Sequence, residues 1–169
     1  MQLDRWLTRS ALRHPDRVAL ETPDARMTYR ELLLAGTRAA ARLLDRGAYP
    51  GDRVAIALPP GQPFVVALHG CLLLRAPAMP IDVRLSAGER AELLRGGVEV
   101  LVSQPLAESG GAPFDVSDPD ERELALIVHT SGTTRTPRPV ELTFGSLAAH
   151  VRAVGAVLGT DPDLSLIHI

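Results

Sequence analysis

The sequence contains no lysine and no asparagine, and all 18 of its basic residues are arginine. A guanidinium stays protonated near neutral pH, so no residue of this chain can act as the catalytic amine that some enzymes require. The formal net charge of −2 gives no broad basic surface of the kind that attracts nucleic acid or anionic membranes. We therefore predict no nucleic-acid partner.

Cysteine is almost absent as well, because Cys71 stands alone. One cysteine excludes an internal disulfide and a CxxC metal site, which is typical of a reducing cytoplasmic compartment. Cys71 lies in the apolar run 64–74, where we expect a small buried side chain rather than a nucleophile. No apolar run approaches the ~18 residues of a membrane span. With 46% apolar and 22% charged residues, the composition is that of a globular protein. We expect it to be cytoplasmic, from the single cysteine and the lack of an apolar run long enough to span a membrane.

The common nucleotide and hydrolase fingerprints are missing too. The sequence has no GxGxxG, no GxxxxGK[ST], no HExxH and no GxSxG pattern. Any nucleotide site must therefore be argued from other residues.

Strand-like and helix-like segments alternate along most of the chain, with short connections between them. This alternation predicts an α/β fold with a mainly parallel sheet flanked by helices. A polar segment, 104–123, is expected to be an exposed loop. The predicted strands are 17–21, 53–58, 78–81, 98–102, 124–128 and 140–142, and the predicted helices are 2–13, 28–46, 63–74, 86–95 and 144–158.

Three helix starts carry capping signals. Thr28 with Glu31, and Ser86 with Glu89, have the spacing of a capping box, in which each side chain bonds the other residue's backbone N–H. Thr143 is placed to cap the helix that follows it. The helix after Thr28 is expected to bury one apolar face, formed by Leu32, Leu33, Gly36, Ala40, Leu43 and Leu44.

The most informative stretch is Thr130-Ser-Gly-Thr-Thr-Arg-Thr-Pro-Arg138, which directly follows the apolar strand 124–128. Ser131, Thr133 and Thr134 offer hydroxyl donors. Gly132 lets backbone N–H groups approach an anion closely, and Arg135 and Arg138 supply permanent charge. These groups suit a polyphosphate, but a polar surface loop held by Ser/Thr turns would have a similar composition.

This stretch, with Val140 and Leu142-Thr143 before a helix, resembles the phosphate-binding signature of the adenylate-forming superfamily. That superfamily includes acyl-CoA synthetases, amino-acid adenylation domains and luciferases. Upstream, 27–32, 51–56 and 80–86 also resemble the family's N-terminal subdomain in order and spacing. The pattern around Pro137–Thr143 most resembles the o-succinylbenzoate–CoA ligases of menaquinone biosynthesis.

The resemblance implies an AMP-forming acid–thiol ligase. A carboxylate would attack the α-phosphate of ATP in the presence of Mg²⁺, and coenzyme A would then displace AMP. Thr130, Ser131, Gly132, Thr133, Thr134 and Arg138 would form the ATP-binding loop, while no catalytic residue and no metal ligand is assigned within this chain. The sequence departs from the family pattern at Arg135 (usually Gly), Arg138 (usually Lys) and Pro139 (usually Gly).

The family's Mg²⁺-serving acid, ribose-binding acid and catalytic lysine would all follow residue 169. We therefore interpret 1–163 as the N-terminal portion of an AMP-binding domain and 164–169 as a non-native tail. The small-molecule carboxylate cannot be identified and the oligomeric state is unknown. Three alternatives stay open: a non-catalytic nucleotide-binding or scaffold module of the same fold, a fatty-acyl or amino-acid adenylating ligase, and a different phosphotransfer enzyme.

Other polar residues give weaker signals. His129 ends the strand beside the loop, where it either faces a ligand or packs with a hydrogen bond, and we favour packing. His69 lies in an apolar helix and is expected in the core or an interface. Asp82 and Arg84 are expected to form a structural pair.

Overall fold

The computed structural model describes residues 6–106, 118–130 and 138–158, which form twelve helices and strands. The helices are α1 (Trp6–Arg13), α2 (Tyr29–Asp45), α3 (Gln62–Leu74), α4 (Ala87–Leu94) and α5 (Phe144–Leu158). The strands are β1 (Val18–Thr22), β2 (Ala25–Thr28), β3 (Val54–Ile56), β4 (Ala78–Pro80), β5 (Val100–Val102), β6 (Leu124–Thr130) and β7 (Arg138–Thr143). The mainly parallel α/β sheet flanked by helices is confirmed.

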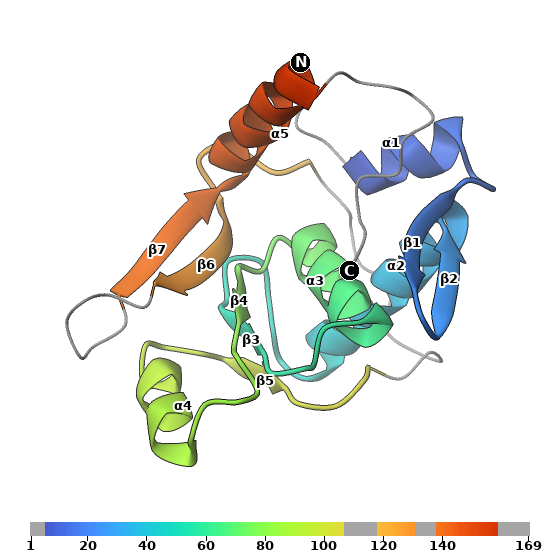
Figure 1. The fold of residues 1–169 in the computed structure, drawn as a ribbon. Helices are drawn as coiled ribbons and strands as arrows, with labels where there is room; N and C mark the ends of the chain where they lie inside the picture. Colours follow the sequence, from blue (N-terminus) through green and yellow to red (C-terminus); the bar gives the residue numbers. More distant parts are fainter. Residues whose placement is uncertain (1–5, 107–117, 131–137, 159–169) are drawn as a thin grey trace.

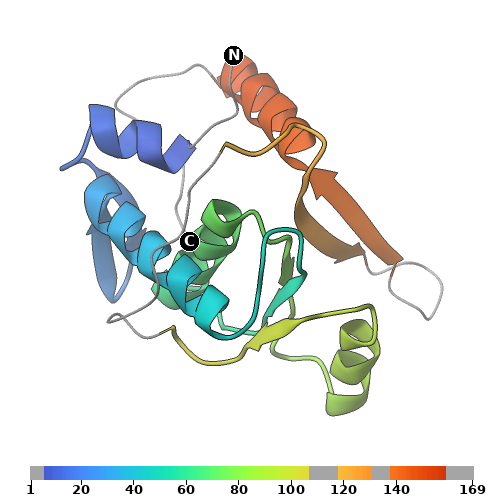
Figure 2. The same ribbon diagram turned by 180° about the vertical axis from the view of Figure 1, so that it is seen from behind.

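The central sheet has the strand order β5-β3-β4-β6-β7 (Figure 1). The β3–β5, β3–β4 and β4–β6 pairs are parallel, and β7 pairs antiparallel with β6. A second sheet consists of β1 and β2 alone. The sequence prediction missed β2, whose four residues fall between the predicted strand 17–21 and the start of the predicted helix 28–46. The β6–β7 hairpin and α5 extend to one side of the molecule (Figure 2).

Alternate residues of β3 face the two sides of the sheet, as the period of a strand requires. Val54 and Ile56 pack in the cluster formed with α2 and α3, whereas Ala55 belongs to the cluster formed with Leu93 of α4. Helices therefore cover both faces, with α2 and α3 on one and α4 on the other (Figures 1 and 2). This two-sided burial explains why the strand segments are apolar throughout.

Both predicted capping boxes are present. The hydroxyl of Thr28 accepts a hydrogen bond from the Glu31 N–H, and Glu31 accepts one from the Thr28 N–H at 2.7 Å. Ser86 and Glu89 repeat the arrangement at the start of α4. The predicted buried face of α2 is confirmed at Leu32, Gly36, Ala40 and Leu43, while Leu33 and Leu44 are only partly buried.

Helices α2 and α3 approach each other closely at two glycines. A Cβ on Gly70 would lie 2.7 Å from the Ala39 Cβ atom, and one on Gly36 would lie 3.2 Å from the Leu73 side chain. Small residues at these positions bring the two helix backbones together and leave little room for relaxation. The close approach of α2 and α3 therefore depends on glycine, which has no Cβ atom, at positions 36 and 70.

Two titratable side chains on α3 are perturbed by their surroundings. Cys71 is fully buried, as expected, and burial raises the pKa of its thiol to about 12. His69 retains some accessible surface, yet burial of its ring lowers its pKa from 6.5 to about 4. Near neutral pH, His69 is therefore neutral, and its burial against other elements agrees with the core or interface position that the sequence predicted.

Replacement of Gly70 by alanine should lower the free energy of unfolding by about 1–3 kcal/mol, because the new methyl group would overlap the Ala39 side chain. Gly88 in α4 is a matched control, since a Cβ there would meet nothing within 4 Å. Gly88→Ala should instead leave stability unchanged or raise it by up to ~1 kcal/mol. Urea unfolding measures the change in the free energy of unfolding for each variant. Equal changes in Gly70→Ala and Gly88→Ala would contradict the close packing of α2 on α3.

His69 should also make the fold sensitive to acid. The unfolded chain takes up a proton on His69 near pH 6.5, whereas the folded chain does so only near pH 4. Above pH 6.5 His69 is neutral in both states, so it does not lower the free energy of unfolding there. As the pH falls from 6.5 to 4, the free energy of unfolding should decrease progressively, by up to about 3 kcal/mol in total. This decrease in the free energy of unfolding should be smaller in His69→Gln than in wild type or in the exposed control His150→Gln. Urea unfolding at several pH values between 6.5 and 4 measures it. An identical pH dependence in all three proteins would refute this role.

Candidate functional site

The predicted phosphate loop joins β6 to β7 at the end of a hairpin. In the register of this hairpin, Thr130 lies opposite Arg138 and His129 opposite Pro139. The Thr130 hydroxyl donates a hydrogen bond of 3.4 Å to the Arg138 carbonyl. The hairpin therefore brings the first and last predicted site residues together, and both are exposed. The other predicted site residues, Ser131, Gly132, Thr133 and Thr134, lie outside the described residues.

The base of the hairpin is fixed by contacts from three other segments. The Gly145 N–H donates to the Glu121 carbonyl at 2.9 Å, and a Cβ on Gly145 would lie 2.8 Å from that same oxygen. The Glu123 carboxylate pairs with Arg75 at 3.3 Å. Thr143 caps α5 as predicted, since its hydroxyl accepts from the Ser146 N–H at 3.1 Å. These contacts anchor both strands that carry the loop.

A second ion pair joins β7 to the far side of the sheet. Arg53 precedes β3 and contacts Glu141 of β7 at 3.0 Å, while its other terminal nitrogen donates to the Gly96 carbonyl at 2.8 Å. Both side chains are partly exposed, so solvent screens the attraction between them. The pair therefore adds little stability and mainly holds β7 in position relative to the segment before β3.

His129 occupies the position next to Thr130 on β6. It is partly buried, and burial lowers the pKa of its imidazole. Its Nδ1 atom is buried without a hydrogen-bond partner in the described part of the chain. The side chain is thus partly packed, and the predicted hydrogen bond is not found at Nδ1 within the described residues.

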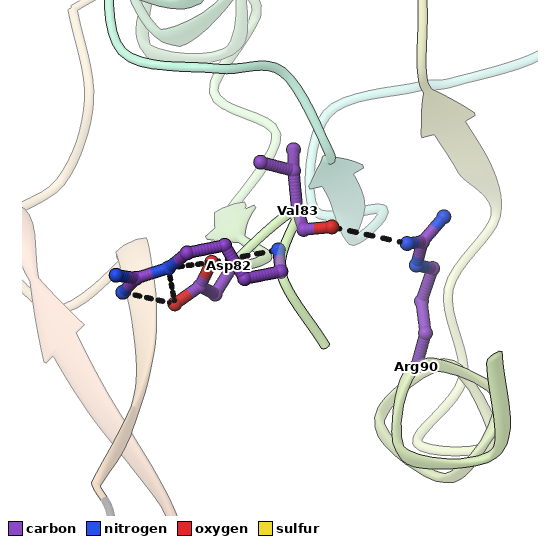
Figure 3. Close-up of polar contacts among 4 residues, drawn as sticks. Asp82, Val83 and Arg90 are labelled. Carbon is purple, nitrogen blue, oxygen red and sulfur yellow. Dashed lines mark hydrogen bonds and ion pairs between the residues drawn. The ribbon is translucent and has the colours of Figure 1, made fainter. Parts of the chain in front are cut away.

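Asp82 and Arg84 follow β4, the strand beside β6, and form the pair that the sequence predicted. The Arg84 guanidinium contacts both carboxylate oxygens, at 2.7 Å for Nη2–Oδ2 and 3.0 Å for Nε–Oδ1. The Arg84 N–H also donates to Oδ1 at 2.9 Å. Figure 3 shows this contact together with Arg90 of α4, which donates to the Val83 carbonyl. The turn after β4 is thus held by charge-assisted hydrogen bonds.

Parallel pairing of β4 with β6 places the carboxyl ends of both strands at one edge of the sheet. The chain leaves β3 for α3 on one face and leaves β4 for α4 on the other. In α/β sheets, ligands generally bind outside the carboxyl ends of neighbouring strands whose connections run to opposite faces. The sequence did not predict that Asp82 and Arg84 lie at the same edge of the sheet as Thr130, because the apolar pattern of each strand does not reveal the order of the strands in the sheet.

Within the residues that the structure describes, no three His, Cys, Asp or Glu side chains gather as a possible metal site. Across those same ranges, no helix is both long and apolar enough to cross a membrane.

The Asp82–Arg84 contact has a measurable signature. Hydrogen bonds from Arg84 lower the Asp82 pKa from 3.8 to about 2. In Arg84→Gln, the Asp82 pKa should rise toward its ordinary value, as followed by NMR titration of the carboxyl carbon. Arg90→Gln is the matched control, since Arg90 bonds backbone carbonyls and not Asp82. A wild-type Asp82 pKa near 4, or an unchanged value in Arg84→Gln, would refute the contact.

Comparison with known proteins gives a consistent result. The AMP-binding enzyme family model matches residues 7–108. The 2-succinylbenzoate–CoA ligase of Bacillus velezensis is 33% identical over 162 residues, covering 83% of this chain and 33% of that protein. The phosphinothricin tripeptide synthetase PhsC of Streptomyces viridochromogenes is 34% identical over 156 residues, covering 78% of this chain and 14% of that protein.

Among solved structures, the chain is similar to o-succinylbenzoate–CoA synthetase from Bacillus subtilis in complex with the acyl-adenylate intermediate. The TM-score is 0.85 at 28% identity, covering 94% of this chain and 47% of that one. The same enzyme in complex with ATP and magnesium gives a TM-score of 0.82 at 27% identity, covering 92% of this chain and 47% of that one. The chain thus spans about a third of the length of the curated ligase. The family match over residues 7–108, in the same fold, shows that this chain belongs to the AMP-binding enzyme family.

Proposed function

We propose that this chain supplies the phosphate-binding portion of an ATP-dependent acid–thiol ligase that forms an acyl-adenylate and transfers the acyl group to coenzyme A. The observation that carries the proposal is the β6–β7 hairpin, which brings Thr130 and Arg138 together at the carboxyl edge of the sheet. The solved relative with the same fold binds ATP and magnesium. The proposed ATP-contacting residues are Thr130, Ser131, Gly132, Thr133, Thr134 and Arg138.

The described residues fit a polyphosphate chemically. Arg138 is exposed at the start of β7, so its guanidinium can accept an anion without losing a buried partner. Thr130 is exposed at the end of β6, and the bond that its hydroxyl donates to the Arg138 carbonyl is long, at 3.4 Å. ATP would supply the activated α-phosphate that the carboxylate attacks. The role proposed for these residues is to hold the remaining phosphates in place.

As the acyl substrate we propose o-succinylbenzoate, because two kinds of comparison support it. The curated relative from Bacillus velezensis is named as the ligase for this acid, and the solved relative contains its adenylate. An amino-acid substrate is the second candidate, since a peptide synthetase matches the chain with similar identity. A reducing cytoplasmic location is also proposed, from the single buried thiol of Cys71.

The direct test uses the complete reading frame that contains these residues. With ATP and Mg²⁺, pyrophosphate release should depend on o-succinylbenzoate and not on hexadecanoate or on any amino acid, and AMP release should then require coenzyme A. Release driven by an amino acid alone would favour the second candidate. No release with any carboxylate, although nucleotide still binds, would favour a non-catalytic module of the same fold.

The role of Arg138 is tested in the same assay. Arg138→Gln should lower kcat/KM about tenfold or more, because a charge-assisted contact to phosphate is lost. Arg138→Lys keeps the charge and should retain most of the activity. Arg152→Gln, on the exposed side of α5, is the matched control and should not change kcat/KM. Equal activity of Arg138→Gln and wild type would exclude Arg138 from the site.

Residues 1–169 by themselves are expected to show no ATP–pyrophosphate exchange, because the relatives that catalyse such chemistry are about three times as long. The measurement is incorporation of labelled pyrophosphate into ATP, with the complete protein as the positive control. Exchange by residues 1–169 above the background of a protein-free sample would overturn this prediction.

A further inference from the structure

A cavity of about 390 Å³ lies outside the central sheet, against helices α2 and α3. It is bounded by β2, α2, the first turns of α3 and the segment after β5. Its volume falls at the lower end of the ~300–1,000 Å³ that is typical of small-molecule sites. No described residue of β6 or β7, the strands that the proposed phosphate loop connects, lines this cavity.

The spacing of residues on α2 produces this cavity. Glu31, Leu34, Ala35, Arg38 and Ala39 all line it, and they follow the three- and four-residue spacing of a single helix face. The two alanines are short, so the longer side chains on either side of them leave a hollow. Val66 of α3 and Met27 of β2 complete an apolar lining.

The charged residues around the cavity do not balance one another. The Glu31 carboxylate keeps its negative charge, but its Oε2 atom is turned toward Thr28, where it accepts hydrogen bonds from the N–H at 2.7 Å and the hydroxyl at 2.9 Å. The two arginines that line the cavity, Arg26 and Arg38, therefore still outnumber its one carboxylate. Arg26 reaches Glu21 only at 3.7 Å, and both of those side chains are more than half exposed. Arg38 makes no hydrogen bond or ion pair with any other described residue. The cavity therefore combines an apolar lining with an unmatched guanidinium.

We propose that this cavity is a second ligand site, which binds a small organic anion carrying one carboxylate or phosphate group and a short apolar chain. The Arg38 guanidinium, assisted by Arg26, binds the anionic group through paired N–H donors. The apolar chain lies against Ala35, Ala39 and Val66. The Gln62 amide, which also lines the cavity, supplies a neutral donor.

The test uses residues 1–169 labelled with ¹⁵N, with hexanoate and hexyl phosphate as probes and 1-hexanol as the uncharged control. Both anions should cause saturable NMR shifts at the Arg38 side chain and at amides of α2 and the start of α3, with a Kd on the order of 1 mM. The anion with the lower Kd identifies the preferred group. Hexanol should bind about tenfold more weakly or not at all.

Two variants remove different parts of the proposed site. Arg38→Gln should weaken anion binding about tenfold or more, because it removes the charge from an exposed helix position. Ala35→Leu keeps every charge but fills the hollow, and it should also weaken binding about tenfold. Arg9→Gln, on the exposed side of α1, is the matched control and should bind as wild type does. Circular dichroism confirms that each variant is folded.

Three outcomes would overturn the proposal. The first is an absence of saturable shifts with either anion at concentrations up to about ten times the expected Kd. The second is equal binding of hexanol and the anions, which would show that charge plays no part. The third is unchanged binding in folded Arg38→Gln and Ala35→Leu. None of these results depends on the ligase assay, so this proposal and the proposed function fail independently.

Discussion

The close contact between α2 and α3 is the constraint on which the rest of this structure depends. Gly70 lets α3 lie directly against Ala39 of α2, and together the two helices cover one face of the sheet. Since α3 connects β3 to β4, its position fixes how those two parallel strands align. β4 in turn pairs with β6, so the placement of Thr130 at the end of β6 depends on how α3 packs against α2.

Charge and burial have separate roles in this chain. The ion pairs Asp82–Arg84, Arg53–Glu141 and Arg75–Glu123 are all at least partly exposed, so they contribute little to stability and mainly fix turns and the hairpin. No polar or charged residue is buried within the described ranges. Stability therefore comes mainly from apolar packing on both faces of the sheet.

Much of the fold could be predicted because its signals are local. The capping boxes at Thr28 and Ser86 and the N-cap at Thr143 each depend on residues within one helical turn. The hairpin strand β2 was missed because four residues carry too little periodicity to distinguish a strand from a turn. The placement of Asp82–Arg84 beside Thr130, and the cavity at Arg38, depend on strand order and helix packing, which no local pattern encodes.

The strand order also has a consequence for how the chain folds. Residues 54–102 form β3, β4 and β5 with α3 and α4 between them, so these contacts join segments close in sequence. β6 begins at Leu124 but pairs with β4, which ends at Pro80, so a long loop must close first. Closing that loop costs chain entropy before any contact offsets it. The hairpin that carries the proposed site thus docks onto a sheet whose centre forms from more local contacts.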